Sequence, residues 1–174
     1  MSFSFRPMDE LSARAIARWR YGAPYAMYNI PSDTLEETRQ CFLDPQNGYY
    51  ALHDDQEQLV AYCCYGLDAR VIGGDYGGEA LDLGLGVRPD LTGQGRGLDF
   101  VQAVVEFARR TFEPVACRVT VADFNKRALR VWEKVGFRPV QAFERNGDGM
   151  PFVILACTLT KLPDTFANKR VEAS

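Results

Sequence analysis

The feature that most constrains this chain is an alternating strand that leads into a glycine loop and then into a long amphipathic helix. Apolar side chains alternate with small or polar ones over 80–87, and they recur every three or four positions over 97–112. Between strand and helix, glycine occupies alternate positions, at Gly93, Gly95 and Gly97. Without Cβ atoms in the way, backbone N–H groups can converge beside the unpaired N–H groups of the helix start. The segment therefore predicts a phosphate-binding loop.

The kind of phosphate ligand can be narrowed by elimination. A P-loop places Lys and then Ser or Thr after its last glycine, whereas Leu98 and Asp99 follow here. The dinucleotide pattern G-x-G-x-x-G would need its third glycine one residue after Gly97. Both patterns are disfavoured. An ATP-dependent enzyme stays an alternative, which thermal stabilisation by ATP–Mg would reveal.

The remaining segments predict an α/β fold with a single mixed, mostly antiparallel sheet flanked by helices on both faces. The expected order is strand, two helices, three strands, helix, strand, helix, two strands. In that order we expect them over 3–5, 9–19, 32–43, 49–53, 59–67, 80–87, 97–112, 117–121, 125–136, 138–143 and 152–159. The glycine-rich stretch 73–78 is predicted to be a loop. We expect one domain over 1–160 and a polar C-terminal tail over 161–174.

Composition excludes several classes of protein. The chain has 174 residues, 47% of them hydrophobic, which is too apolar for a disordered chain. No stretch is long and apolar enough for a membrane span, and the net charge of −3 without a basic cluster predicts no nucleic-acid partner. The five cysteines are odd in number and lie in apolar runs, so we expect buried thiols in a cytoplasmic protein. The single histidine, His53, has no paired metal ligands, and we expect no metal site.

Two segments together resemble the GNAT acetyltransferases. The stretch Thr92-Gly93-Gln94-Gly95-Arg96-Gly97, preceded by Val87-Arg88-Pro89-Asp90, is similar to the family's coenzyme A loop, Gln or Arg, two residues, Gly, one residue, Gly or Ala. About 30 residues on, the stretch from Asn125 to Phe137 is similar to the family's helix segment. The resemblance is strong over 80–143. It implies an acyl-CoA N-acyltransferase-like fold and transfer of an acetyl group from acetyl-CoA to the amine of a small molecule or peptide, which attacks the thioester directly.

The resemblance also implies which residues bind acetyl-CoA. Main-chain groups of the strand bond to the pantetheine, with the Val87 N–H placed to polarise the carbonyl. The glycine loop holds the phosphates, and Asn125 caps a helix and reaches the pantetheine arm. The full expected set is Leu85, Gly86, Val87, Thr92, Gly93, Gln94, Gly95, Arg96, Gly97, Asn125 and Trp132.

Two positions depart from the family pattern. Thr92 stands where the loop usually begins with Gln or Arg, which removes a long side chain and leaves the backbone donors. Trp132 stands where many members carry a tyrosine that protonates the departing thiolate, and an indole N–H has no useful acidity. A catalytically silent acyl-CoA-binding or regulatory module of the same fold is therefore the alternative function.

Catalysis and acceptor binding are assigned to side chains near the strand over 80–87. Asp82 is the first candidate for removing the amine proton, with pairing to an arginine as its structural alternative, and Glu79 is the second. Gly84 and Gly86 predict a bare face on which the pantetheine and the acceptor approach the backbone. An aromatic acceptor wall is expected from Trp19, Tyr21, Tyr25 and Tyr28, with Tyr76 lining the pocket or donating a proton. Strands near the end of the chain are expected to allow a homodimer.

Overall fold

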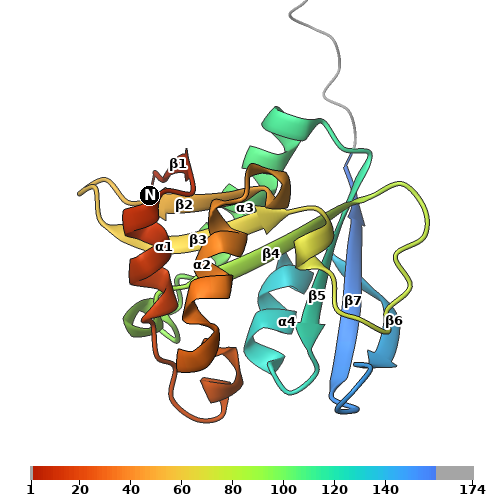
Figure 1. Cartoon of the computed structure of the whole chain (residues 1–174). Coiled ribbons are helices and arrows are strands. Elements are labelled where there is room, and N and C mark those ends of the chain that lie inside the picture. Colours follow the sequence, from red (N-terminus) through yellow and green to blue (C-terminus); the bar gives the residue numbers. More distant parts are fainter. Residues whose placement is uncertain (1, 160–174) are drawn as a thin grey trace, which may run out of the picture.

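The structure is a computed structural model that describes residues 2–159, and its elements follow the predicted order (Figure 1). They are β1 (Ser4–Pro7), α1 (Glu10–Ala17), α2 (Leu35–Leu43), β2 (Tyr49–His53), β3 (Leu59–Tyr65), β4 (Leu81–Val87), α3 (Gly97–Phe112), β5 (Ala116–Ala122), α4 (Lys126–Lys134), β6 (Arg138–Glu144) and β7 (Pro151–Thr158). The predicted tail over 161–174 lies outside the described residues.

The strands form one sheet of seven in the order β1-β2-β3-β4-β5-β7-β6. Strands β4 and β5 pair in parallel, with α3 as the crossover between them, and the other neighbours within 2–159 pair antiparallel. The predicted mixed, mostly antiparallel sheet is therefore confirmed. The last strand within residues 2–159, β7, inserts between β5 and β6, which leaves β6 at one edge of the sheet.

Helices cover both faces of the sheet, as predicted. The stripe Phe100, Val101 and Val104 of α3 packs with Leu83, Leu85 and Val87 of β4, and α4 joins the same core through Trp132. On the opposite face, α1 and α2 pack over Tyr62 through a second cluster that contains Ala13, Ile16 and Phe42. Among the described residues, no helix has the length and apolarity that a bilayer span requires. All five cysteines are free thiols.

Strands β4 and β5 are paired over only part of their length. Their register partners are Leu81 with Cys117, Asp82 with Arg118, and Leu83 with Val119. Beyond these pairs the two strands run apart (Figure 1). Residues 84–87 and 120–122 then border an opening in the sheet, which we call the β4–β5 split.

Several boundaries differ from the predicted ones by one to three residues, among them the ends of β3 and α1. Strand β3 ends at Tyr65 instead of 67, because Gly66 adopts a φ of +114° and residues 67–69 turn into a short 3-10 helix. The first helix ends at Ala17 instead of Trp19. Its N-cap is Asp9, whose side chain accepts a hydrogen bond from the Ser12 N–H at 2.7 Å.

The expected bare face over Gly84 and Gly86 is wrong. A Cβ built on Gly86 would lie 2.2 Å from the ring of Tyr62, and one built on Gly84 would lie 2.6 Å from Sγ of Cys64. These residues are register partners on β3 and β4, so their side chains share one face of the sheet. The glycines make room for protein side chains from β3.

This packing predicts a large effect for one methyl group. Gly86→Ala should destabilise the fold by about 1–3 kcal/mol, because the Tyr62 ring is held among other aromatic rings and cannot move aside. Urea unfolding measures the loss, and Gly22→Ala is the matched control, since no atom lies within 4 Å of a Cβ built there. In the double variant with Tyr62→Ala, the Gly86→Ala penalty should shrink. An unchanged penalty would contradict the packing argument.

Candidate active site

A buried ion pair holds β4 and β5 together just before they separate. The carboxylate of Asp82 accepts hydrogen bonds from Arg118, at 2.8 Å from Nε and 3.1 Å from Nη2. The Arg70 Nε donates to the same carboxylate at 2.7 Å. The Asp82 and Arg118 side chains are only 3% and 7% exposed. This bidentate contact between register partners fixes the strand spacing one residue before the last β4–β5 pair.

The assignment of Asp82 as the catalytic base is therefore corrected. Both of its oxygens are engaged by guanidinium groups, and almost none of the side chain is reachable from solvent. Asp82 instead has the structural role that we named as its alternative, as the partner of an arginine.

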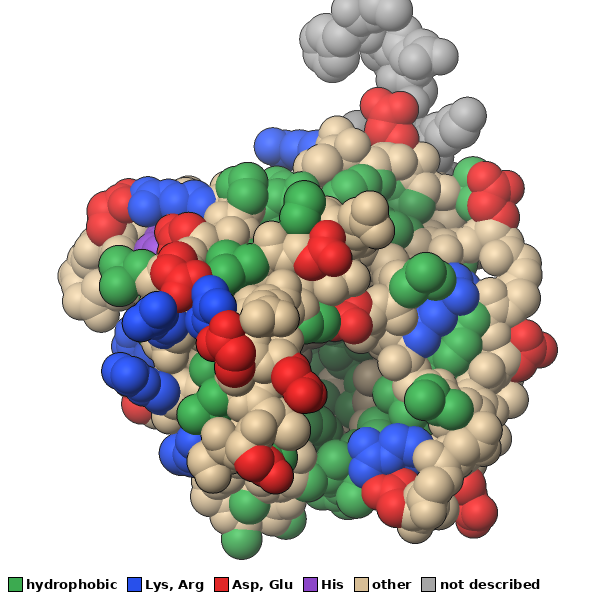
Figure 2. All heavy atoms as spheres, in the orientation of Figure 1, with side chains coloured by type: hydrophobic (Ala, Val, Ile, Leu, Met, Phe, Trp, Pro, Cys, Tyr) green, Lys and Arg blue, Asp and Glu red, His purple; other side chains and the backbone are tan. Residues whose placement is uncertain are grey.

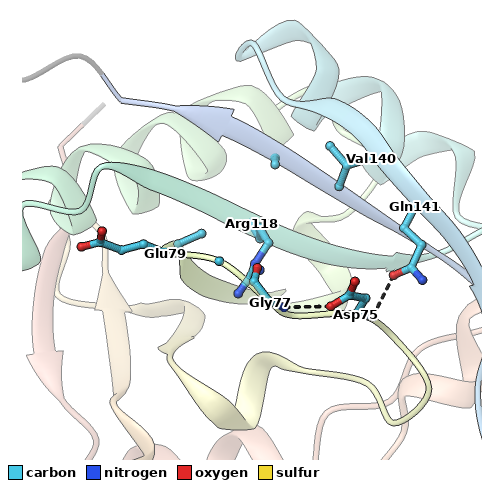
Figure 3. Close-up of a pocket in the computed structure, with 9 residues that line it drawn as sticks. Asp75, Gly77, Glu79, Arg118, Val140 and Gln141 are labelled. Carbon is cyan, nitrogen blue, oxygen red and sulfur yellow. Dashed lines mark hydrogen bonds between the residues drawn. The ribbon is translucent and has the colours of Figure 1, made fainter.

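Glu79 does not support the second assignment either. It precedes β4 at the end where β4 and β5 are paired, and it points away from Arg118 (Figure 3). With Asp75, Arg118, Gln141 and others it lines a depression of about 460 Å³ beneath the glycine-rich loop. This loop is anchored, because Arg118 donates to the Gly77 carbonyl at 2.7 Å and Gln141 accepts from the Asp75 N–H at 2.8 Å.

The hydroxyl groups of Tyr76 and Thr120 lie close together at the narrow end of the split. The Tyr76 ring is in contact with the guanidinium groups of Arg70 and Arg118, whose central carbons lie 5.2 and 5.5 Å from the ring centroid. Its hydroxyl accepts from the Val71 N–H at 2.8 Å and is 2.9 Å from Oγ1 of Thr120. Thr120 is the first β5 residue beyond the last β4–β5 pair. Our sequence reasoning did not identify Thr120, although it alternates with Arg118 on one face of β5.

Backbone groups of β4 point into the split. Gly66 donates to the Asp82 carbonyl and Arg88 donates to the Val60 carbonyl, both at 2.9 Å, so the even-numbered residues of β4 face β3. Successive peptide groups of a strand point in opposite directions. The N–H groups of Leu85 and Val87 therefore point toward the opening, which is the direction that the family resemblance implied for them.

The glycine loop has the shape that its sequence predicts. Gly93 and Gly95 adopt φ values of +76° and +77°, which residues with a side chain rarely adopt. The hydroxyl of Thr92 donates to the Pro89 carbonyl at 2.8 Å, and the amide of Gln94 donates to the Asp90 carbonyl at 2.6 Å. These two side chains brace the loop. They leave its backbone as the part that can hold an anion. Arg96 is the N-cap residue of α3, and its guanidinium lies over the Phe100 ring.

Asn125 and Trp132 lie near opposite ends of α4. Asn125 is the predicted cap, with its side chain accepting from the Ala128 N–H at 3.1 Å, and its amide nitrogen donates to the Tyr28 hydroxyl at 3.2 Å. Trp132 is 3% exposed and packs edge-on against Phe137, with ring centroids 4.9 Å apart. Trp132 therefore belongs to the core, and its assignment as a cofactor contact is corrected.

Three tyrosines of the α1–α2 connection reach across the split, and we call them the aromatic bridge: Tyr21, Tyr25 and Tyr28. The Tyr21 hydroxyl donates to the Val87 carbonyl on β4 at 2.9 Å. On the β5 side, Tyr28 contacts Asn125, and the Tyr25 ring lies 4.4 Å below the guanidinium carbon of Arg127. Burial raises the pKa of Tyr21 to about 12 and also raises that of Tyr28, so both phenols stay protonated.

The aromatic residues that we expected to form the acceptor wall lie beside the β4–β5 split. Trp19 packs on Tyr62, with centroids 5.8 Å apart, beside the bridge. Figure 2 shows a hollow in the middle of the face covered by α1 and α2, with hydrophobic side chains on its floor and acidic side chains near its rim. Across residues 2–159, no group of three or more His, Cys, Asp or Glu side chains is placed to hold a metal ion.

The split sheet, the glycine loop and the capped α4 agree with a comparison of the sequence with family models. The model of the acetyltransferase (GNAT) family matches residues 13–137. This chain belongs to that family. No curated protein sequence matches it.

Solved structures of other GNAT proteins share the fold at low sequence identity. The aminoglycoside acetyltransferase AAC(6′)-Ib, in complex with paromomycin and acetyl-CoA, has a TM-score of 0.73 and 17% identity, covering 97% of this chain and 99% of that one. A chimera of the spermidine N-acetyltransferase SpeG from Vibrio cholerae and hSSAT has a TM-score of 0.70 and 14% identity, covering 91% and 96%. A GNAT acetyltransferase from Bacillus anthracis has a TM-score of 0.69 and 15% identity, covering 91% and 95%.

The ion pair of this GNAT protein predicts a loss of stability. Asp82→Asn leaves the buried Arg118 without its countercharge, and the free energy of unfolding should fall by about 3–5 kcal/mol in urea titrations. The matched control is Asp148→Asn, whose pair with Arg145 is half exposed and should matter much less. If Asp82→Asn keeps full stability and loses only turnover, the catalytic assignment would return.

Proposed function

We propose that this protein is an acetyl-CoA-dependent N-acetyltransferase that acetylates a primary amine of a small molecule or peptide, with residues 1–160 as its catalytic domain. The observation that carries the proposal is the β4–β5 split, into which the N–H groups of Leu85 and Val87 point. The split begins beside the strand end that leads into the glycine loop. A narrow acyl carrier with a phosphate-bearing tail suits an opening of that form.

The residues present fit acetyl-CoA. Gly93 and Gly95 have the positive φ values that turn loop N–H groups toward one point, next to the start of α3. Leu85 and Val87 offer main-chain donors for the amide groups of the pantetheine. When bound, acetyl-CoA supplies an acetyl group activated as a thioester.

Groups of this chain would orient the acceptor amine and the thioester toward each other. The amine nitrogen of the acceptor forms a bond to the acetyl carbon, the carbon–sulfur bond breaks, and the sulfur leaves with the electron pair. The acceptor nitrogen loses one proton and the thiolate gains one. The Val87 N–H would stabilise the negative charge that develops on the carbonyl oxygen. Alignment of the two reactants supplies most of the acceleration, because such pre-orientation can lower a barrier by about 7–11 kcal/mol.

Many family members carry a tyrosine as the general acid at the position of Trp132, and we assign that role to other hydroxyl groups of this chain. Trp132 is buried, so the Thr120 and Tyr76 hydroxyls at the narrow end of the split are our candidates for contacting the departing sulfur. Little assistance is needed, since a thiol has a pKa of about 8.5 and its thiolate is a good leaving group. Thr120→Val, which keeps the shape and removes the hydroxyl, should lower kcat with little change in coenzyme A affinity.

The test of the proposal is release of free thiol from acetyl-CoA with a panel of amines. Similar solved structures are named as spermidine and aminoglycoside acetyltransferases, so polyamines and aminoglycosides come first and peptides second. We expect at least one amine to raise thiol release above the rate with water. The alternative, a silent acyl-CoA-binding module, is favoured by the engaged Asp82 and the buried Trp132. Tight binding of acetyl-CoA with no stimulation by any amine would decide for it.

The pH dependence follows from the same geometry. With Asp82 held by arginines and Tyr21 having a pKa of about 12, we assign no protein base to the acceptor. A protonated amine is not a nucleophile, so kcat/KM should rise about tenfold per pH unit below the acceptor's own pKa, near 10.4 for an alkylamine. Initial rates between pH 6 and 9.5 measure the slope. A plateau already at pH 7 would show that a protein group removes the proton.

A homodimer is a further part of the proposal. Strand β6 is the edge of the sheet, and most of its residues are exposed, with Val140 60% exposed. An unpaired strand edge can pair with a second copy. Sedimentation equilibrium of the full chain tests this, and a monomer at all concentrations would count against it.

A further inference from the structure

The glycine loop has an arginine against it that comes from a different element. Arg127 lies in the first turn of α4, and its Nη1 would be 3.0 Å from a Cβ built on Gly93. The guanidinium therefore rests on the loop at a position where the chain has no side chain. The same guanidinium lies over the ring of Tyr25, 4.4 Å from the centroid. Tyr25 and the loop backbone thus position the guanidinium at the loop surface.

Within residues 2–159, the positive charge of Arg127 has no carboxylate partner. Neighbouring cations have carboxylate partners: Arg88 binds Asp90, and Lys126 binds Asp123, each at 2.7 Å. No carboxylate within 2–159 pairs with Arg127, and its side chain is exposed. A planar guanidinium matches the oxygens of a phosphate group and can donate two parallel hydrogen bonds to it.

We propose that Arg127 binds the pyrophosphate of coenzyme A and takes over the contact that is lost where Thr92 replaces the usual Gln or Arg of the loop. This inference rests on the proposed function. Thr92 is turned into its own loop, toward the Pro89 carbonyl, and cannot reach a ligand while it makes that bond. Arg127 restores a cation from α4, and the start of α3 supplies backbone donors beside it.

The same contact would link the two substrate sites. Tyr25 stacks on Arg127 and belongs to the aromatic bridge that borders the acceptor side of the split. A pyrophosphate that orders Arg127 would also order Tyr25. Occupation of the phosphate site would then favour the acceptor-binding arrangement of the bridge.

The test compares three ligands by calorimetry on the folded full-length protein: coenzyme A, 3′-dephospho-coenzyme A and pantetheine. Arg127→Ala should weaken coenzyme A and dephospho-coenzyme A alike, by about tenfold or more, and leave the weak binding of pantetheine unchanged. Arg130→Ala, an exposed arginine one turn further along α4, is the matched control and should change none of the three. Arg127→Lys should recover part of the affinity, because it keeps the charge and loses the planar stack.

Each other outcome would overturn the assignment. An equal loss for pantetheine would mean that Arg127 only supports the aromatic bridge. A loss confined to coenzyme A would place Arg127 on the 3′-phosphate, and no loss at all would leave it as a solvated side chain. Failure of the unchanged protein to bind coenzyme A would count against the proposed function instead, so the two results can be told apart.

Discussion

The buried contact between Asp82 and Arg118 is the constraint on which the rest of the site depends. It joins register partners of β4 and β5, and the last pair of the two strands follows one residue later. Breaking a parallel ladder exposes backbone groups that a sheet would otherwise pair, so the strands need a strong hold at the point where pairing stops. The ion pair supplies that hold. With Arg70 and Tyr76 it also fastens the glycine-rich loop over the same end of the sheet.

The β4–β5 split is lined mainly by backbone groups and by neutral hydroxyl groups. The N–H groups of Leu85 and Val87 point into it, and the hydroxyls of Thr120 and Tyr76 meet at its narrow end. The three tyrosines of the aromatic bridge close the outer side of the split, and their phenol groups are neutral. Such a site suits a reaction between an activated thioester and an amine, in which orientation contributes more than acid–base chemistry.

Local signals in the sequence predicted a large part of this arrangement. The glycine loop, the order of the elements and the Asn125 cap depend on residues close together in the chain, and the structure bears them out. The alternation of side chains along β4 correctly predicted the face of the sheet on which Asp82 lies. The predicted role of Asp82 as a catalytic base was wrong. Its partner Arg118 lies 36 residues away on another strand. The same holds for Gly86, whose missing side chain is explained by Tyr62 on β3.

The sequence by itself determined that this chain carries a strand, a phosphate-binding turn and a helix in succession, because backbone freedom at glycine and helical periodicity are local properties. Only the tertiary structure decided what the side chains around that segment do. Strand register paired Asp82 with Arg118, and helix packing buried Trp132 and brought Arg127 against Gly93. Contacts of this kind depend on how distant segments are aligned in space, and no periodicity within one segment records that alignment.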